Sequence, residues 1–282
     1  MSFELSLPIP LSLLLRDAAL GEVESARSAL KRGRPKDIHS ARKHCKKLRA
    51  LLQLLQPVLR RRTRRSLDHA VRDAARAVAV RREARVMSET LETLAQRHEM
   101  YADALLALRE PVRKQVRRHA EPQGTRIALD RLDTVREAIE ILDLETADAA
   151  ALERGLRRSY RKARKRARVA AENPQAERLH EWRKRSKAHA YACDLLVPLW
   201  PVLEDRSHRL SMLNDALGEH HDLADLLRAL DALDSIDPAL RVVIEAEQQG
   251  CAHAALAFGD ALFGDKAKHW SLALEDRYGG GD

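Results

Sequence analysis

Apolar residues recur every three or four positions along most of this chain, which is the spacing of an amphipathic α-helix. One such series includes Leu48, Leu52 and Leu55, and another includes Leu132 and Val135. No stretch alternates between apolar and polar positions as a half-buried strand would, and the helix formers Ala, Leu, Arg and Glu dominate. Proline and glycine interrupt the pattern at intervals of roughly 15 to 30 residues, where they mark loops. The pattern therefore predicts an all-α protein built as helical bundles.

Two stretches of the chain, residues 38–57 and 179–198, repeat each other at an offset of 141 positions. Each follows a segment with its own helical pattern, over residues 11–31 and 149–171. An offset of this size is far too long for a solenoid repeat, and there are only two copies. The sequence therefore predicts an internal duplication with pseudo-twofold symmetry, with one repeat over residues 11–143 and the other over residues 147–275.

The two repeats carry the same histidine and cations at the same spacing. The matched pairs are His39 with His180, Arg42 with Arg183, Lys43 with Lys184, and Lys46 with Lys187. At about 100° per residue, the first set and Arg49 share one side of a helix and the leucines share the other. Like charges at this spacing repel, and the first motif has no acid on its basic side. An anion held there would convert the repulsion into charge-assisted hydrogen bonds.

Two further helical segments show a basic side. In the segment before the second motif it comprises Arg157, Arg161, Arg164 and Arg168, flanked by Tyr160 and Lys165. A weaker basic stripe follows the first motif and comprises Arg65, Arg72 and Arg76. We take all of these positions except Lys165 as candidate anion-binding residues, together with the two motif sets. For the histidines, a structural role on the helix face remains the alternative.

The charge of the chain is strongly segregated. The net charge is +9, but residues 31–65 hold 14 Lys and Arg against one acid, and residues 154–187 hold 14 against three, so the rest is net acidic. A surface that serves only solubility mixes its signs, whereas segregation of this size indicates a focused positive field and an anionic ligand. A pair of solvated basic helices is the alternative interpretation of the charge alone.

Several classes of function have no support in the sequence. Three cysteines without a CxxC pair argue for a reducing compartment and against a disulfide framework. We find no P-loop, no metal-ligand set and no Ser/His/Asp combination, and we expect neither an enzyme nor a cofactor. No signal peptide or membrane-spanning run is visible, so we expect a cytoplasmic protein that does not bind membranes. The oligomeric state cannot be predicted from this pattern.

Taken in order, these motifs resemble the CHAD domain, the conserved histidine α-helical domain. The resemblance rests on H-x-x-R-K-x-x-K in both repeats, on the run Arg157, Tyr160, Arg161, Arg164, and on "LGEHHDLADLL" at residues 217–227. It covers nearly the whole chain. It implies two four-helix bundles whose basic helices line a central groove or pore, and it implies binding of inorganic polyphosphate. Members of this family are found on polyphosphate granules or fused to a CYTH (triphosphate tunnel) domain.

The resemblance predicts a non-catalytic polyphosphate-binding protein, with granules as one expected location. Other interpretations remain open. A basic groove also suits a nucleic-acid backbone, and weak nucleic-acid binding is compatible with it, although only ten aromatic residues are available for base stacking. An accessory module of enzymes of polyphosphate or triphosphate metabolism, and a scaffold for another protein, are further alternatives. The chain lacks the E-x-E-x-K strand that a CYTH enzyme needs.

Overall fold

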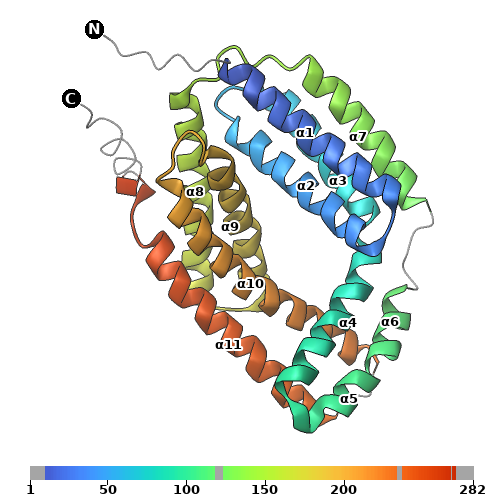
Figure 1. Ribbon diagram of the computed structural model, residues 1–282. Helices are drawn as coiled ribbons and strands as arrows, with labels where there is room; N and C mark the ends of the chain where they lie inside the picture. Colours follow the sequence, from blue (N-terminus) through green and yellow to red (C-terminus); the bar gives the residue numbers. More distant parts are fainter. Residues whose placement is uncertain (1–9, 118–122, 234–236, 268, 271–282) are drawn as a thin grey trace. The chain divides into compact units, whose positions relative to one another are not determined.

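The computed structural model describes residues 10–117, 123–233, 237–267 and 269–270, and this part of the chain is helical without a strand (Figure 1). The all-α prediction is confirmed. The helices are α1 (Leu11–Arg32), α2 (Pro35–Leu54), α3 (Arg61–Ala77), α4 (Val80–Arg97), α5 (Ala102–Ala107), α6 (Arg109–Arg117), α7 (Gly124–Glu140), α8 (Ala149–Glu172), α9 (Ala176–Leu196), α10 (Leu203–Asp231) and α11 (Pro238–Phe263), with a 3₁₀ turn, η1 (Glu99–Tyr101), before α5.

The helices form two compact units. Unit 1 consists of the described parts of Met1–Ala77 and Gln123–Arg158, and unit 2 of the described parts of Val78–Pro122 and Ser159–Asp282. Unit 1 therefore contains α1, α2, α3, α7 and the beginning of α8, and unit 2 contains the remaining helices. These units are defined by contacts, whereas the predicted repeats 11–143 and 147–275 are defined by sequence. The duplication, the two four-helix bundles and the central groove stay predictions.

Unit 1 is a helical bundle in which α1 packs on α2 and α7, and α3 packs on the same two helices (Figure 1). Its core comes from the apolar positions that recur every three or four residues. Val23, Leu48, Val71, Leu132 and Ile139 are each at most 1% exposed. Burying a side chain of this size contributes about 1.5–3 kcal/mol, so the periodic positions of four different helices decide how unit 1 is assembled.

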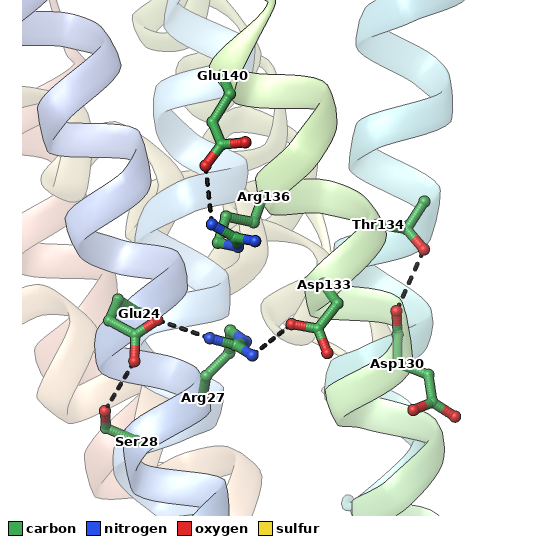
Figure 2. Close-up of polar contacts among 8 residues, drawn as sticks. All are labelled: Glu24, Arg27, Ser28, Asp130, Asp133, Thr134, Arg136 and Glu140. Atoms are coloured by element: carbon green, nitrogen blue, oxygen red, sulfur yellow. Dashed lines mark hydrogen bonds and ion pairs between the residues drawn. The ribbon is translucent and has the colours of Figure 1, made fainter.

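One ion pair joins α1 to α7, and Figure 2 shows it among the polar contacts within these two helices. The Arg27 guanidinium donates to Glu24 on its own helix at 2.8 Å and to Asp133 on α7 at 2.5 Å. Ser28 donates to the second oxygen of Glu24 at 3.2 Å. Arg27 is thus paired with two carboxylates of unit 1, and we do not count it among the cations available to a ligand.

The turn between α1 and α2 positions the first motif. Gly33 ends α1 with φ at 68°, and its N–H donates to the Ala29 carbonyl at 3.2 Å. Glycine suits this left-handed conformation because it has no Cβ to clash with the backbone. Pro35 then begins α2, where its missing N–H costs nothing. The motif residues of α2 follow directly, on a helix whose start is set by these two residues.

Unit 2 is organised around α10, which packs against α9, α11 and α4. Leu91, Leu105, Leu226 and Ile244 form part of one apolar cluster and are fully buried. Near the other end of α11, Gly259 makes room for the ring of Trp182, with which any Cβ at this position would collide. Trp182 is itself fully buried, so the residue directly before Arg183 of the second motif packs in the core of unit 2 beside α11.

Candidate anion-binding surfaces

The first motif lies on the less buried side of α2 in unit 1. His39 and Lys43 are exposed, and Arg42, Lys46 and Arg49 are partly exposed. The opposite side of the helix carries buried Ile38, Ala41, Cys45, Leu48 and Leu52. The sequence prediction that the cations and the leucines take opposite faces of this helix is therefore confirmed.

Neighbouring α3 gives partners to two of these cations. Arg49 makes a two-pronged ion pair with Asp68, at 2.8 Å from Nε and 3.2 Å from Nη2. Arg42 donates to the backbone carbonyl of Ala75. The first motif has no acid on its own basic side, but α3 places a carboxylate beside it. An anion arriving at Arg49 would have to displace Asp68 or share the guanidinium with it.

The basic stripe on α3 also combines arginines with an aspartate. Arg72 lies 3.2 Å from Asp73, the next residue along the helix. Arg65 and Arg76 are exposed, and neither forms an ion pair with another described residue. Unit 1 therefore offers separate cations along α2 and α3, part of whose charge is already neutralised by aspartates of α3.

The basic side of α8 belongs to unit 2 from Ser159 onward and surrounds an open pocket of about 370 Å³. Its lining comprises Arg161, Arg164, Lys165, Arg168, Val169, Glu172 and Ala267. The four cations follow at i, i+3, i+4 and i+7, which keeps them on one face of a helix. Glu172 is the one carboxylate in this lining. Arg161, Lys165 and Arg168 make no ion pair with any residue that the structure describes.

The other side of α8 is apolar and includes Tyr160, which sequence analysis placed among the anion-binding candidates. Tyr160 is fully buried with Ala163, and its hydroxyl donates to the Asp265 carbonyl at 2.7 Å. Burial raises the pKa of this phenol. In this structure Tyr160 therefore supports the basic face from inside unit 2. Arg157, the first arginine of the run, lies in the part of α8 that belongs to unit 1.

Arg164 has two sets of neighbours. It lines the pocket, and its Nε and Nη2 also donate to the carbonyls of Phe263 and Gly264 at 3.0 and 3.1 Å. These carbonyls lie at the end of α11, where no later turn of helix satisfies them. The guanidinium is thus held on one edge by neutral acceptors, and its positive charge is not cancelled by a carboxylate there.

The second motif lies on α9 in unit 2. Lys184 is exposed and pairs with Glu181 at 2.6 Å, while Lys187 lies 6.0 Å from the ring centre of Tyr191. Arg183 lies over Gly218 of α10, and its Nη2 is 3.4 Å from where a Cβ would be. The matched cations of the two motifs therefore occupy different surroundings, because the helices beside them differ.

His180, the histidine of the second motif, is only partly exposed. Its ring centre lies 4.1 Å from that of His221 on α10, and its Nδ1 is buried without a hydrogen-bond partner among the described residues. Burial, reinforced by the nearby Lys184 and Arg183, lowers the pKa of His180 to about 4. At neutral pH this imidazole is uncharged. His39 of the first motif is exposed on α2.

A serine and a histidine that sequence analysis did not pair lie together in the core of unit 2. Ser159 Oγ is 2.7 Å from His189 Nδ1, and Arg206 Nε is 3.3 Å from His189 Nε2. Because a guanidinium can only donate, His189 Nε2 accepts and the ring proton lies on Nδ1. The imidazole then donates to Ser159 and cannot act as its base. Burial also lowers the pKa of His189, which keeps the ring neutral.

Three residues near the α8 pocket were missed or set aside in the sequence. Lys165 completes the i, i+4, i+7 series with Arg161 and Arg168, and that spacing alone would have identified it. Arg206 and Trp270, which pack beside Tyr160, have no such periodicity and follow only from the tertiary structure. In the part of the chain that the structure describes, no group of three or more residues could hold a metal ion.

The sequence profile of the CHAD domain matches residues 15–231, about three quarters of the chain, and the protein therefore belongs to the CHAD domain family. Among solved structures, "PptA from Streptomyces chartreusis" is similar, with a TM-score of 0.57 and 18% sequence identity over 90% of this chain and 98% of that one. This likeness concerns the fold. A search of curated proteins found no match. Of the described helices, none is at once long and apolar enough to span a bilayer.

Proposed function

We propose that this protein binds inorganic polyphosphate without transforming it, and that the basic pocket on α8 is the principal contact. The observation that carries the proposal is the composition of this pocket, in which four cations stand against one carboxylate. Three of those cations have no ion-pair partner among the described residues. Membership of the CHAD family supports the same conclusion, because the resemblance of the motifs to this family implies polyphosphate as the ligand.

The chemistry of the pocket suits a chain of phosphates. Arginine forks can donate two parallel hydrogen bonds to phosphate oxygens, and lysine adds a mobile point charge. Each charge-assisted bond contributes about 1.5–3 kcal/mol. Four cations over two turns of helix extend about 10 Å along the axis, so they can follow a linear ligand. The cations of α9 and of unit 1 would add weaker contacts.

Binding without catalysis fits the residues around the pocket. Phosphoryl transfer uses carboxylates that hold Mg²⁺ beside the phosphates, and the pocket lining supplies Glu172 alone. The buried Ser159–His189 pair has its ring proton on the wrong nitrogen for a base. A surface that binds polyphosphate reversibly would also hold the protein on polyphosphate granules, or serve as an accessory module for enzymes that act on such chains.

Nucleic acid is the main competitor, because phosphate contacts alone do not distinguish the two polymers. Single-strand binders add aromatic side chains on which bases stack. The lining of the α8 pocket contains no aromatic residue, and the neighbouring Tyr160 is fully buried. The surface therefore recognises phosphate charge without a platform for bases.

The test is a competition titration. Long-chain polyphosphate, single-stranded DNA and single-stranded RNA of matched total charge are titrated against the protein at several salt concentrations. We expect polyphosphate to bind more tightly at near-physiological salt, and log affinity to fall linearly with log salt by about 0.7 for each phosphate neutralised. Equal displacement by nucleic acid would favour the nucleic-acid interpretation, and a salt-independent affinity would contradict capture by charge.

A further inference from the structure

The end of α11 is held by side chains from two other helices of unit 2. Arg164 of α8 donates to the Phe263 and Gly264 carbonyls, and Tyr160 donates to the Asp265 carbonyl at 2.7 Å. Arg206 of α10 donates to the Leu262 carbonyl at 2.9 Å. Four consecutive carbonyls are thus satisfied by three side chains.

This end of α11 needs such partners. The last carbonyls of a helix have no later N–H to receive, and they carry the negative end of the helix dipole. Helices often place a Lys or Arg in their own last turn for this reason, but α11 has no basic residue there. The cations that cap it come from α8 and α10, and one of them, Arg164, is also a wall of the anion pocket.

Trp270 packs against two of these three side chains, Tyr160 and Arg206. Its ring stacks on Tyr160 with centres 4.8 Å apart and an angle of 12°, and Arg206 lies 4.8 Å from the same ring. Arg206 is also 5.1 Å from the centre of Tyr160. We call the carbonyls of residues 262–265 together with Trp270 the C-terminal platform. Ala267, which lies between these carbonyls and Trp270 in the sequence, lines the pocket beside Arg164.

The platform restricts Arg164 in a defined way. Nε and Nη2 form one edge of the guanidinium, and that edge is taken by the two carbonyls. Arginine has five N–H donors, so the remaining ones are still available to a ligand. Without the platform, this long side chain would lose much of its rotamer freedom only when the anion bound, and the affinity would fall by that cost.

We propose that the C-terminal platform is part of the anion site and positions Arg164 for phosphate. This inference rests on the proposed function of the α8 pocket. The platform begins at Leu262, beyond residue 231, where the match to the CHAD profile ends. Arg164 contacts the ligand directly, whereas Tyr160, Arg206 and Trp270 act as positioning residues behind it.

Because Arg164 contacts the platform and also lines the pocket, the stability of the platform and the affinity for the anion are coupled. If the platform favours the binding-competent position of Arg164, then a bound anion must stabilise the platform by the same factor. Polyphosphate should therefore slow hydrogen exchange of the amides near the end of α11, although none of the platform residues is among those that line the pocket.

The experiment compares two arginine-to-lysine variants that keep the charge. Arg164→Lys cannot bridge two carbonyls through a planar fork, while Arg161→Lys changes a pocket arginine that has no contact with the platform. We expect Arg164→Lys to lower polyphosphate affinity about tenfold and Arg161→Lys about two- to threefold. The slope of log affinity against log salt should stay that of the wild type in both, because no charge is lost.

A smaller change tests the same inference in case Arg164→Lys does not fold. Tyr160→Phe removes only the hydroxyl that donates to Asp265, and we expect it to lower affinity about two- to fivefold and to abolish part of the ligand-induced protection at the end of α11. If wild-type protein binds polyphosphate but the two lysine variants lose affinity equally, and exchange at the end of α11 does not respond to ligand, the platform has no positioning role. If the wild type does not bind polyphosphate, the proposed function falls, and this inference with it.

Discussion

The basic surface of α2 and α3 in unit 1 and the basic pocket of α8 in unit 2 both present cations at helical spacing, but their electrostatic surroundings differ. In unit 1, α3 places Asp68 against Arg49, and Arg72 lies beside Asp73. In unit 2, the partner that α11 offers to Arg164 is a pair of neutral carbonyls. The comparison shows that the charge available to a ligand depends on what the adjacent helix carries, as well as on the basic helix itself.

This difference affects how strongly each surface can bind phosphate. A carboxylate that forms two hydrogen bonds with an arginine competes directly with a phosphate for the same fork. A carbonyl competes less, because it brings no negative charge, and it leaves the arginine oriented. We therefore expect unit 1 to hold polyphosphate more weakly than the α8 pocket, even though both surfaces present arginines at helical spacing.

Among single substitutions in unit 1, a gain in affinity should come from removing the competing carboxylate. Asp68→Asn keeps the size of the side chain but releases Arg49, so we expect polyphosphate affinity at low salt to rise about three- to tenfold. The free energy of unfolding should fall by no more than about 1 kcal/mol, as for other partly exposed ion pairs. Isothermal titration and chemical denaturation measure the two changes.

The matched control for this variant is Glu140→Gln. Glu140 pairs with Arg136 at 2.8 Å on α7, in the same unit, and neither residue belongs to the candidate surfaces. The two variants change the net charge equally, so a general electrostatic effect would appear in both. An equal gain in affinity from Glu140→Gln would show that Asp68 does not specifically block Arg49.

A smaller effect should appear on acidification, and it arises in unit 2. Burial lowers the pKa values of His189 and His220, and together with neighbouring cations it lowers the pKa of His180 from 6.5 to about 4. The unfolded chain therefore takes up protons from about pH 6.5 downward, while the folded protein resists protonation of His180 until about pH 4. The free energy of unfolding should fall as the pH drops through this window.

His180→Gln provides the test of this pH dependence. Glutamine does not titrate, so the variant should lose less stability than the wild type between pH 6.5 and pH 4, as measured by chemical denaturation at several pH values. The comparison with the wild type isolates His180 from the carboxylates that also titrate at acid pH. Identical pH profiles would mean that His180 is not held neutral in the folded protein.

The sequence was a good guide to the helices and to their faces. The spacing of Leu48, Val135 and Ile139 identifies buried stripes correctly because burial follows the helical period. The same reasoning places Arg161 and Arg168 together on one face of α8, where the structure shows the pocket. Periodicity is a local property, so it can be read from one segment at a time.

What could not be predicted depends on contacts between segments far apart in the chain. Asp68 lies 19 positions from Arg49, and nothing in the motif indicates that α3 brings it there. Tyr160 looked like a polar neighbour of the arginines, but its ring is fully buried and its hydroxyl reaches Asp265. The pairing of Ser159 with His189 is equally invisible in sequence, because it joins α8 to α9.

The most direct test of the account compares two triple variants with the same loss of charge. Arg161→Gln, Lys165→Gln and Arg168→Gln remove the open cations of the α8 pocket, and Arg65→Gln, Arg72→Gln and Arg76→Gln remove the stripe of α3. Polyphosphate affinity is measured for both at one salt concentration, after circular dichroism has confirmed unchanged helicity. We predict a loss on the order of 100-fold or more for the α8 variant and less than about tenfold for the α3 variant. Equal losses, or a larger loss from the α3 variant, would contradict the claim that the α8 pocket is the principal anion site.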